Sequence, residues 1–162
     1  MKRGLQIAVI GAGDASADLL ELARAIGREL AARGATLVCG GRGGVMEAAA
    51  HGARERGGHT IGIIPSFDHG QANPHIEFVI ATGMGEARNA IVAGSADAVI
   101  AMAGEGGTLS EIGFALKLGR PIVAIRAWPH IDGIAARADE PAEAAAEAIR
   151  LALARDHYQG PR

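Results

Sequence analysis

Glycine-rich turns follow three apolar runs of the sequence, and each turn leads into a pattern typical of a helix. Glycine allows positive φ and brings backbone N–H groups close to a ligand without a side chain between them. A strand, a glycine turn and a helix start can therefore hold an anion through backbone N–H groups and the helix dipole. We predict a phosphate site built by Gly11 and Gly13; by Gly40, Gly41, Arg42, Gly43 and Gly44; and by Gly104, Gly106, Gly107 and Thr108.

Three charged side chains stand next to glycine turns, two of them at the turns above and the third at a further turn. Arg42 is flanked by four glycines and is well placed to meet an anion, although such a bare loop also suits a mobile, idle charge. Arg88 opens a helical pattern after a glycine turn, either as a guanidinium fork for phosphate or carboxylate or as a solvated charge. Glu111 follows Thr108 with the T-x-x-E spacing of a capping box, and a carboxylate there can equally serve in catalysis.

Other chemistries fit the sequence less well. A dinucleotide-binding fingerprint would have glycine at the position of Ser16. It would also have an acidic residue at the end of the second apolar run, where this sequence has Cys39, so NAD binding is disfavoured. Asp68, His69 and His75 match no common zinc spacing, and we predict no metal. Cys39 has no base nearby in sequence and is predicted to be a small buried side chain.

Composition limits the class of protein. Hydrophobic residues make up 49% of the 162 residues but aromatic residues only 3%, which favours a core of Val, Ile, Leu and Ala in a parallel sheet covered by Ala-rich helices. The net charge of −2 gives no general attraction to nucleic acid or to an anionic membrane. No apolar run reaches the length of a membrane span, and a single cysteine suits a reducing compartment. We predict a cytoplasmic protein without membrane or nucleic-acid partners.

The elements that carry the turns alternate along the chain. The periodicity predicts strands at 5–10, 35–39, 60–64, 76–80, 98–102 and 121–125, and helices at 18–33, 45–56, 86–94, 109–118 and 141–154. Such alternation indicates an α/β fold with parallel βαβ units, in which the carboxyl ends of the strands meet at one crevice. We predict one domain over 1–155, a polar lid at 66–75, one short edge strand within 127–139 and a flexible tail at 156–162.

Four segments together resemble a known family. They read CGGRGGVMEA at 39–48, GIIP at 62–65, TGMGEARN at 82–89 and GEGGTLSE at 104–111. The sequence is similar to the Rossmann-like LOG superfamily, also called lysine-decarboxylase-like, and within it to the molybdenum cofactor carrier protein group. The resemblance covers residues 5–125 in order. It implies a single-domain Rossmann-like three-layer sandwich with a mainly parallel sheet, a phosphate site on the glycine turns, and assembly into dimers or tetramers.

The resemblance also implies roles for two side chains. In the cytokinin-activating LOG enzymes, an Arg and the Glu of P-G-G-x-G-T-x-x-E serve the hydrolysis of a nucleoside 5′-monophosphate, and Arg88 and Glu111 fall on those positions. The sequence departs from the pattern at Ala103, which replaces the proline, at Glu105, which replaces the second glycine, and at Asn89, which replaces a lysine. Glu105 brings an anion into a turn that is expected to face phosphate.

Two functions follow from this resemblance. The first is a homo-oligomeric protein that binds a phosphorylated heterocycle, a nucleotide or a pterin, with molybdopterin or the molybdenum cofactor as the implied ligand. The alternative is a LOG-type nucleoside 5′-monophosphate phosphoribohydrolase, an N-glycosidase, with Arg88 and Glu111 as catalytic residues. The Ala-rich helical patterns at 45–53 and 87–93 can pack closely against a second copy of the chain.

Overall fold

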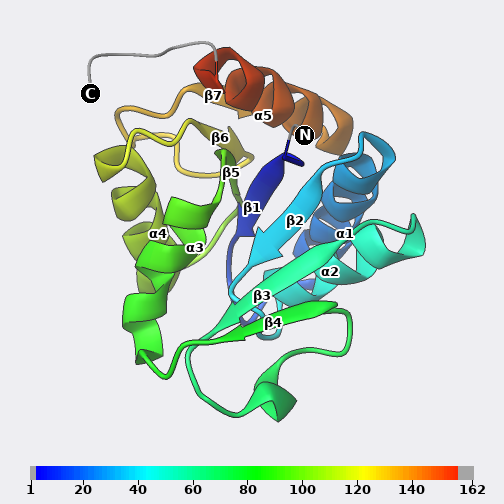
Figure 1. Ribbon diagram of the computed structural model, residues 1–162. Helices are drawn as coiled ribbons and strands as arrows, with labels where there is room; N and C mark the ends of the chain where they lie inside the picture. The colour runs from blue at the N-terminus through cyan, green and yellow to red at the C-terminus, as the bar shows by residue number, and fades with distance from the viewer. Residues whose placement is uncertain (1–2, 157–162) are drawn as a thin grey trace.

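The computed structural model describes residues 3–156, which form a parallel sheet with helices on both faces (Figure 1). The strands of the described chain are β1 (Gln6–Ile10), β2 (Thr36–Cys39), β3 (Thr60–Ile64), β4 (Phe78–Ala81), β5 (Ala98–Ala101), β6 (Ile122–Ile125) and β7 (Ala136–Ala138). Its helices are α1 (Ala17–Ala32), α2 (Val45–Glu55), α3 (Asn89–Ser95), α4 (Gly106–Lys117) and α5 (Pro141–Asp156), with 3-10 turns η1 (His69–Gln71) and η2 (Gly85–Arg88).

The two faces of the sheet form two separate cores. Because side chains alternate along a strand, Ile7 and Val9 of β1 join the core under α1, α2 and α5, whereas Ala8 and Ile10 join the core under α3 and α4. Figure 1 shows the same arrangement, with α1 and α2 on one side of the sheet and α3 and α4 on the other. The predicted α/β three-layer sandwich is therefore confirmed.

Strand order places a topological switch in the middle of the sheet. The described strands lie in the order β4-β3-β2-β1-β5-β6-β7, and all the pairs are parallel. The chain builds outward from β1 in one direction and then crosses to β5, which pairs with the other side of β1 and aligns Ile10 with Ala101. In open α/β sheets, ligands bind outside the carboxyl ends of the strands at such a point.

Helices α1 and α2 approach each other at the level of the backbone. A Cβ on Gly27 would lie 2.0 Å from the carbonyl oxygen of Ala49, and one on Gly52 would lie 1.9 Å from that of Arg24. Each helix therefore presents its glycine to the main chain of the other. This contact holds α2, whose first turn follows the Gly40–Gly44 segment, at a fixed distance from α1.

Some predicted boundaries are wrong. Helix α4 begins at Gly106 rather than at 109, and its N-cap residue is Glu105. Thr108 therefore lies inside the first turn, and the capping box predicted for Thr108 and Glu111 does not form. The helix predicted at 86–94 consists of η2 followed by α3, because a 3-10 turn precedes the α-helical part.

The carboxyl end of the described chain is helical further than predicted. Asp156, the first residue of the predicted tail, belongs to α5, and the rest of that tail lies outside the described residues. The short edge strand expected within 127–139 is present as β7. No helix among the described residues is long and apolar enough to cross a membrane.

Candidate functional site

A cavity of about 410 Å³ opens at the carboxyl ends of β1, β2 and β5. It is the place where the turns after these strands meet, as the switch in strand order requires. Among the described residues, eight of those predicted from sequence line this cavity. They are Gly11, Gly13, Arg42, Gly43, Arg88, Gly107, Thr108 and Glu111. Ala12, Asp14, Met46, Glu86, Asn89 and Glu105 line it as well.

The other predicted glycines shape the walls without lining the cavity; they are Gly40, Gly41, Gly44, Gly104 and Gly106. Gly44 has φ +66°, and a Cβ there would lie 2.4 Å from the carbonyl oxygen of Ala12. A Cβ on Gly104 would lie 2.1 Å from Thr108 Oγ1. Any side chain at these two positions would push neighbouring turns apart.

Ala12 joins the three glycine turns. Its backbone N–H donates to the carbonyl of Ala103 at 2.9 Å, and its own carbonyl accepts from the N–H of Val45 at 2.9 Å. The turn after β1 is thereby hydrogen-bonded to the turn after β5 on one side and to the start of α2 on the other. The cavity wall is a single hydrogen-bonded unit rather than three independent loops.

Two helices, α2 and α4, begin at this wall, and the first N–H of α2 already donates to the carbonyl of Ala12. Within the described residues, no side chain caps α2 or α4, whereas Ser16 Oγ accepts from Leu19 N at the start of α1. The first-turn N–H groups of a helix have no partner inside the helix and carry its positive dipole end. Gly107 and Thr108 lie in the first turn of α4 and line the cavity, so this end of the helix is suited to an anion.

Arg88 is buried at the cavity wall, with 5% of its surface exposed. Its Nη1 donates to Asn89 Oδ1 and its Nη2 donates to the carbonyl of Gly40 at 3.3 Å. Among the described residues its Nε has no hydrogen-bond partner, although the atom is buried. A buried donor left without an acceptor is costly, so an anionic ligand that reached Arg88 would satisfy a group the protein leaves open.

Asn89, which departs from the LOG pattern, links Arg88 to the start of α4. Asn89 Nδ2 donates to Ser110 Oγ at 2.9 Å, and Ser110 Oγ donates to the carbonyl of Gly107 at 2.7 Å. The guanidinium and the helix start are thus held in one network. The sequence identified Asn89 as a departure from the LOG enzymes but did not reveal this link, because the link spans two helices.

Glu111 is buried under the cavity floor with 6% of its surface exposed. Burial raises the pKa of its carboxyl to about 7, the Arg88 charge lowers it, and the Glu86 charge raises it further. A carboxyl that titrates near neutral pH can both give and take a proton under physiological conditions. It lies beyond the first turn of α4, so it does not cap the helix.

Further carboxylates give the cavity a mixed electrostatic character. Asp14, Glu86 and Glu105 line it together with the cations Arg42 and Arg88. A carboxylate repels a phosphate but accepts hydrogen bonds from N–H groups of a heterocycle. Asp14 and Glu86 were missed from the sequence; their only signal is that each directly follows a glycine in a turn after a strand.

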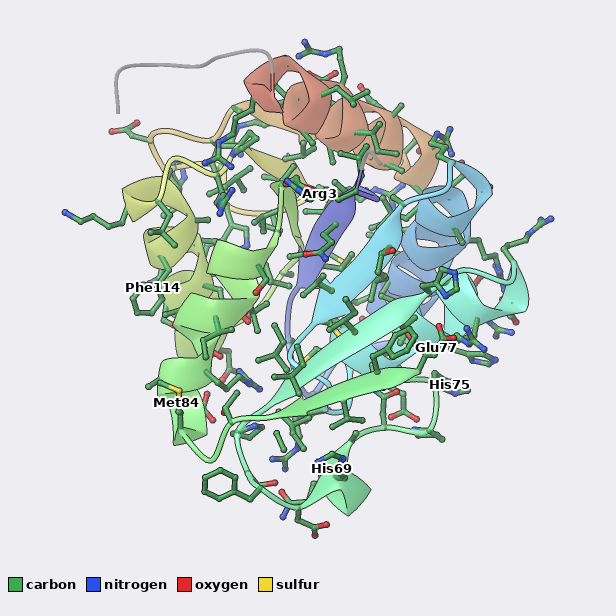
Figure 2. All side chains as sticks on the ribbon, in the orientation of Figure 1. Arg3, His69, His75, Glu77, Met84 and Phe114 are labelled. Atoms are coloured by element: carbon green, nitrogen blue, oxygen red, sulfur yellow. The ribbon has the colours of Figure 1, made fainter. Side chains whose placement is uncertain are left out.

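The remaining chemical residues lie elsewhere. Cys39 is buried, and burial raises the pKa of its thiol to about 12, so it is not a thiolate nucleophile at neutral pH. His69 stands exposed in η1, whereas His75 stacks on His51, and Figure 2 shows His69 and His75 well apart. The polar segment 66–75, predicted as a lid, contributes no lining residue within the described part of the chain.

Fold and cavity together define a Rossmann-like α/β protein with a cavity at the topological switch of its sheet. The sequence matches the SLOG cluster4 family over residues 4–154, and the chain belongs to that family. The predicted relation to the LOG superfamily is thereby confirmed.

Solved structures and named relatives agree with this assignment. The molybdenum cofactor binding protein of Rippkaea orientalis is 36% identical, with a TM-score of 0.83 over 93% of this chain and 98% of the other. The molybdenum cofactor carrier protein of Chlamydomonas reinhardtii is 34% identical, with a TM-score of 0.83 over 94% and 99% of the two chains. The cytokinin riboside 5′-monophosphate phosphoribohydrolase of Mycobacterium marinum is 38% identical over 78% of this chain and 72% of its own.

Proposed function

We propose that the protein binds a phosphorylated heterocycle, a nucleotide or a pterin, in the cavity at the ends of β1, β2 and β5. The observation that carries this proposal is the open start of α4 beside the buried, incompletely bonded Arg88. The volume of about 410 Å³ falls in the range of small-molecule sites, roughly 300–1,000 Å³. Similarity to two proteins named for the molybdenum cofactor supports that cofactor, a pterin, as the ligand.

Each part of the cavity has a role in this proposal. Backbone N–H groups of Gly107 and Thr108 take the phosphate, and the guanidinium groups of Arg42 and Arg88 neutralise its charge. The carboxylates of Asp14, Glu86 and Glu105 face N–H groups of the heterocycle. Glu105 in particular works against a second phosphate, so a monophosphate fits better than a ligand with more charge.

Glu111 favours a second candidate, the hydrolysis of a nucleoside 5′-monophosphate. In that reaction water adds to C1′ of the ribose, the C1′–N bond breaks, and the proton of the water ends on the departing base. Glu111 would accept the proton from water, and Arg88 would orient the phosphate. The carboxyl pKa near 7 and the similarity to the M. marinum phosphoribohydrolase support this candidate.

One experiment separates the carrier from the enzyme. Purified protein is incubated with AMP and free base is measured by chromatography, for the natural protein and for Glu111→Gln and Glu105→Gln. For an N-glycosidase, Glu111→Gln should lose about 10²-fold or more in rate and Glu105→Gln should lose far less.

The same measurement identifies a carrier. In that case the natural protein releases no base, binds AMP or a pterin monophosphate in calorimetry, and retains a pterin in mass spectrometry of the purified protein. Base release that survives Glu111→Gln but disappears in Glu105→Gln would transfer the chemistry to Glu105. Absence of both binding and base release would overturn the proposed function.

Assembly and compartment complete the proposal. We propose a homo-dimer or tetramer that forms through the outer surface of α4, where Phe114 and Leu118 are exposed. Figure 2 shows Phe114 pointing away from the sheet and Met84, also exposed, at the start of η2 on the same side of the molecule. A free, buried Cys39 suits the reducing cytoplasm, which is the compartment we propose.

A further inference from the structure

Asn73 holds the turn that carries Arg42. It lies between β3 and β4, is 9% exposed, and donates from Nδ2 to the carbonyl of Arg42 at 2.9 Å. Its backbone N–H donates to the carbonyl of Gly41, also at 2.9 Å. Two successive carbonyls of the cavity turn are therefore bound by one residue from a segment that does not line the cavity.

The segment around Asn73 is itself anchored. Asn73 Oδ1 accepts from the N–H of His75 at 3.0 Å, and Thr60 Oγ1 of β3 donates to the carbonyl of His75 at 2.7 Å. The imidazole of His75 stacks on that of His51 in α2, with ring centroids 4.1 Å apart and planes inclined by 7°. Strand β3 and helix α2 thus give Asn73 a fixed position from which to bind the turn.

Arg42 needs such an external restraint. Its side chain is exposed at the cavity, and within the described chain no hydrogen bond or ion pair holds its guanidinium. Gly41 and Gly44 on either side have φ of +73° and +66°, in the region that glycine visits freely. An unrestrained glycine turn would lose conformational entropy when a ligand ordered it, and affinity would fall accordingly.

We propose that Asn73 is a positioning residue for anion binding, which fixes the backbone of Arg42 so that its guanidinium meets the phosphate without prior reordering. The proposal rests on the proposed function in one respect, the contact of Arg42 with a phosphate. The segment 66–75 therefore acts on the cavity from behind the turn after β2 and not as a lid above it.

The variant that tests the proposal is Asn73→Asp. Aspartate keeps the shape and the acceptor for His75 N but replaces the donor with an oxygen that repels the carbonyl of Arg42. Thr60→Val is the comparison variant. It removes the hydrogen bonds of Thr60 Oγ1 with the carbonyl of His75 and with the N–H of Glu77. It leaves both contacts of Asn73 with the cavity turn and the stacking of His75 on His51, which keep Asn73 in place.

The first readout needs no ligand. Trypsin cuts after arginine, and its rate at the Arg42–Gly43 bond of the folded protein reports opening of the turn. We expect Asn73→Asp to be cut about tenfold faster than the natural protein, and Thr60→Val to stay within about twofold once its global stability is taken into account. Equal rates for Asn73→Asp and the natural protein would overturn the proposal.

The second readout is affinity for inorganic phosphate and for AMP by calorimetry. Asn73→Asp should weaken binding about tenfold when Arg42 is present and less than about twofold in the Arg42→Ala background, since the two residues act together. Equal weakening in both backgrounds would overturn a role through Arg42. If the natural protein binds neither probe, the proposed function fails, and the cleavage rates still decide whether Asn73 fixes the turn.

Discussion

Burial gives Glu111 a protonation behaviour that an exposed glutamate lacks. Its carboxyl is almost fully enclosed, and the Arg88 charge only partly offsets the cost of ionising it there. Glu111 therefore lowers the free energy of unfolding at neutral pH, while it provides an acid or a base at the cavity. Such costs are typical of functional positions, where a locally unfavourable group is kept for its chemistry.

This cost predicts a pH-dependent stability difference at Glu111. The pKa is about 7 in the folded protein against the ordinary 4.5, so the folded state binds the proton more tightly. The resulting stabilisation is fully present below pH 4.5 and is lost as the pH rises through 7. Relative to the natural protein, Glu111→Gln should therefore gain roughly 3 kcal/mol in free energy of unfolding between pH 4.5 and pH 8.

Urea denaturation of both proteins at several pH values measures this difference directly. Comparison with the variant is needed because the lowered pKa of His75, caused mainly by burial and then by the His51 charge, acts with the opposite sign in the same region. A stability difference that does not change between pH 4.5 and pH 8 would show that Glu111 keeps an ordinary pKa.

The helix pair α1–α2 depends on glycine in both members. Gly27 and Gly52 each face a backbone carbonyl of the opposite helix, so neither position has room for even one carbon atom. These contacts set the distance between α1 and α2, and the Gly40–Gly44 segment leads directly into α2. Packing between two helices thus reaches the cavity through the chain itself.

Alanine at either glycine should consequently destabilise the protein. We expect Gly27→Ala and Gly52→Ala each to lower the free energy of unfolding by roughly 2–3 kcal/mol, the upper part of the range for overpacking. Gly94→Ala in α3 is the control, because its Cβ would lie at an ordinary 3.5 Å from Leu118 Cδ1. Gly94→Ala should raise the free energy of unfolding by roughly 0.4–1 kcal/mol. If urea denaturation showed a comparable decrease in the free energy of unfolding for all three variants, this interpretation would be contradicted.

The outer surface of the protein is unusually apolar over one helix. Leu109, Phe114 and Leu116 of α4 and Leu118, the residue that follows it, are all exposed. Large apolar side chains that stay exposed on one element are candidates for a protein–protein contact. A second copy of the chain is the partner that the LOG resemblance implies, and a twofold contact would bring two cavities close to one interface.

Light scattering tests this assembly. The natural protein should be a dimer or tetramer at tens of micromolar, and Phe114→Glu should shift it toward monomer because it buries a charge in the contact. Leu153→Glu, an equally drastic change at an exposed leucine of α5, should leave the oligomer intact. A monomeric natural protein, or identical behaviour of the two variants, would exclude α4 as the contact.

The local sequence pattern was sufficient to predict the α/β fold and the glycine turns that form the cavity. Apolar periodicity marks strands and helices, and glycine at a strand end identifies the turns, because both are properties of neighbouring residues. The parallel order of strands then brings the turns after β1, β2 and β5 together whatever their side chains are. For the same reason Glu111, which follows β5, could be placed near the cavity before its contacts were known, whereas Arg88, which follows β4, was placed by the resemblance to the LOG pattern.

Contacts between distant segments settled the rest. Helix α4 begins at Gly106, so Glu111 is not a helix cap, and the packing around it makes it a buried acid. Asn73 reaches Arg42 across 31 positions of sequence. Periodicity indicates which residues are buried but not which residues pack against them. The pKa of Glu111 and the hydrogen bond from Asn73 to Arg42 therefore follow from the packing of the elements and not from their order along the chain.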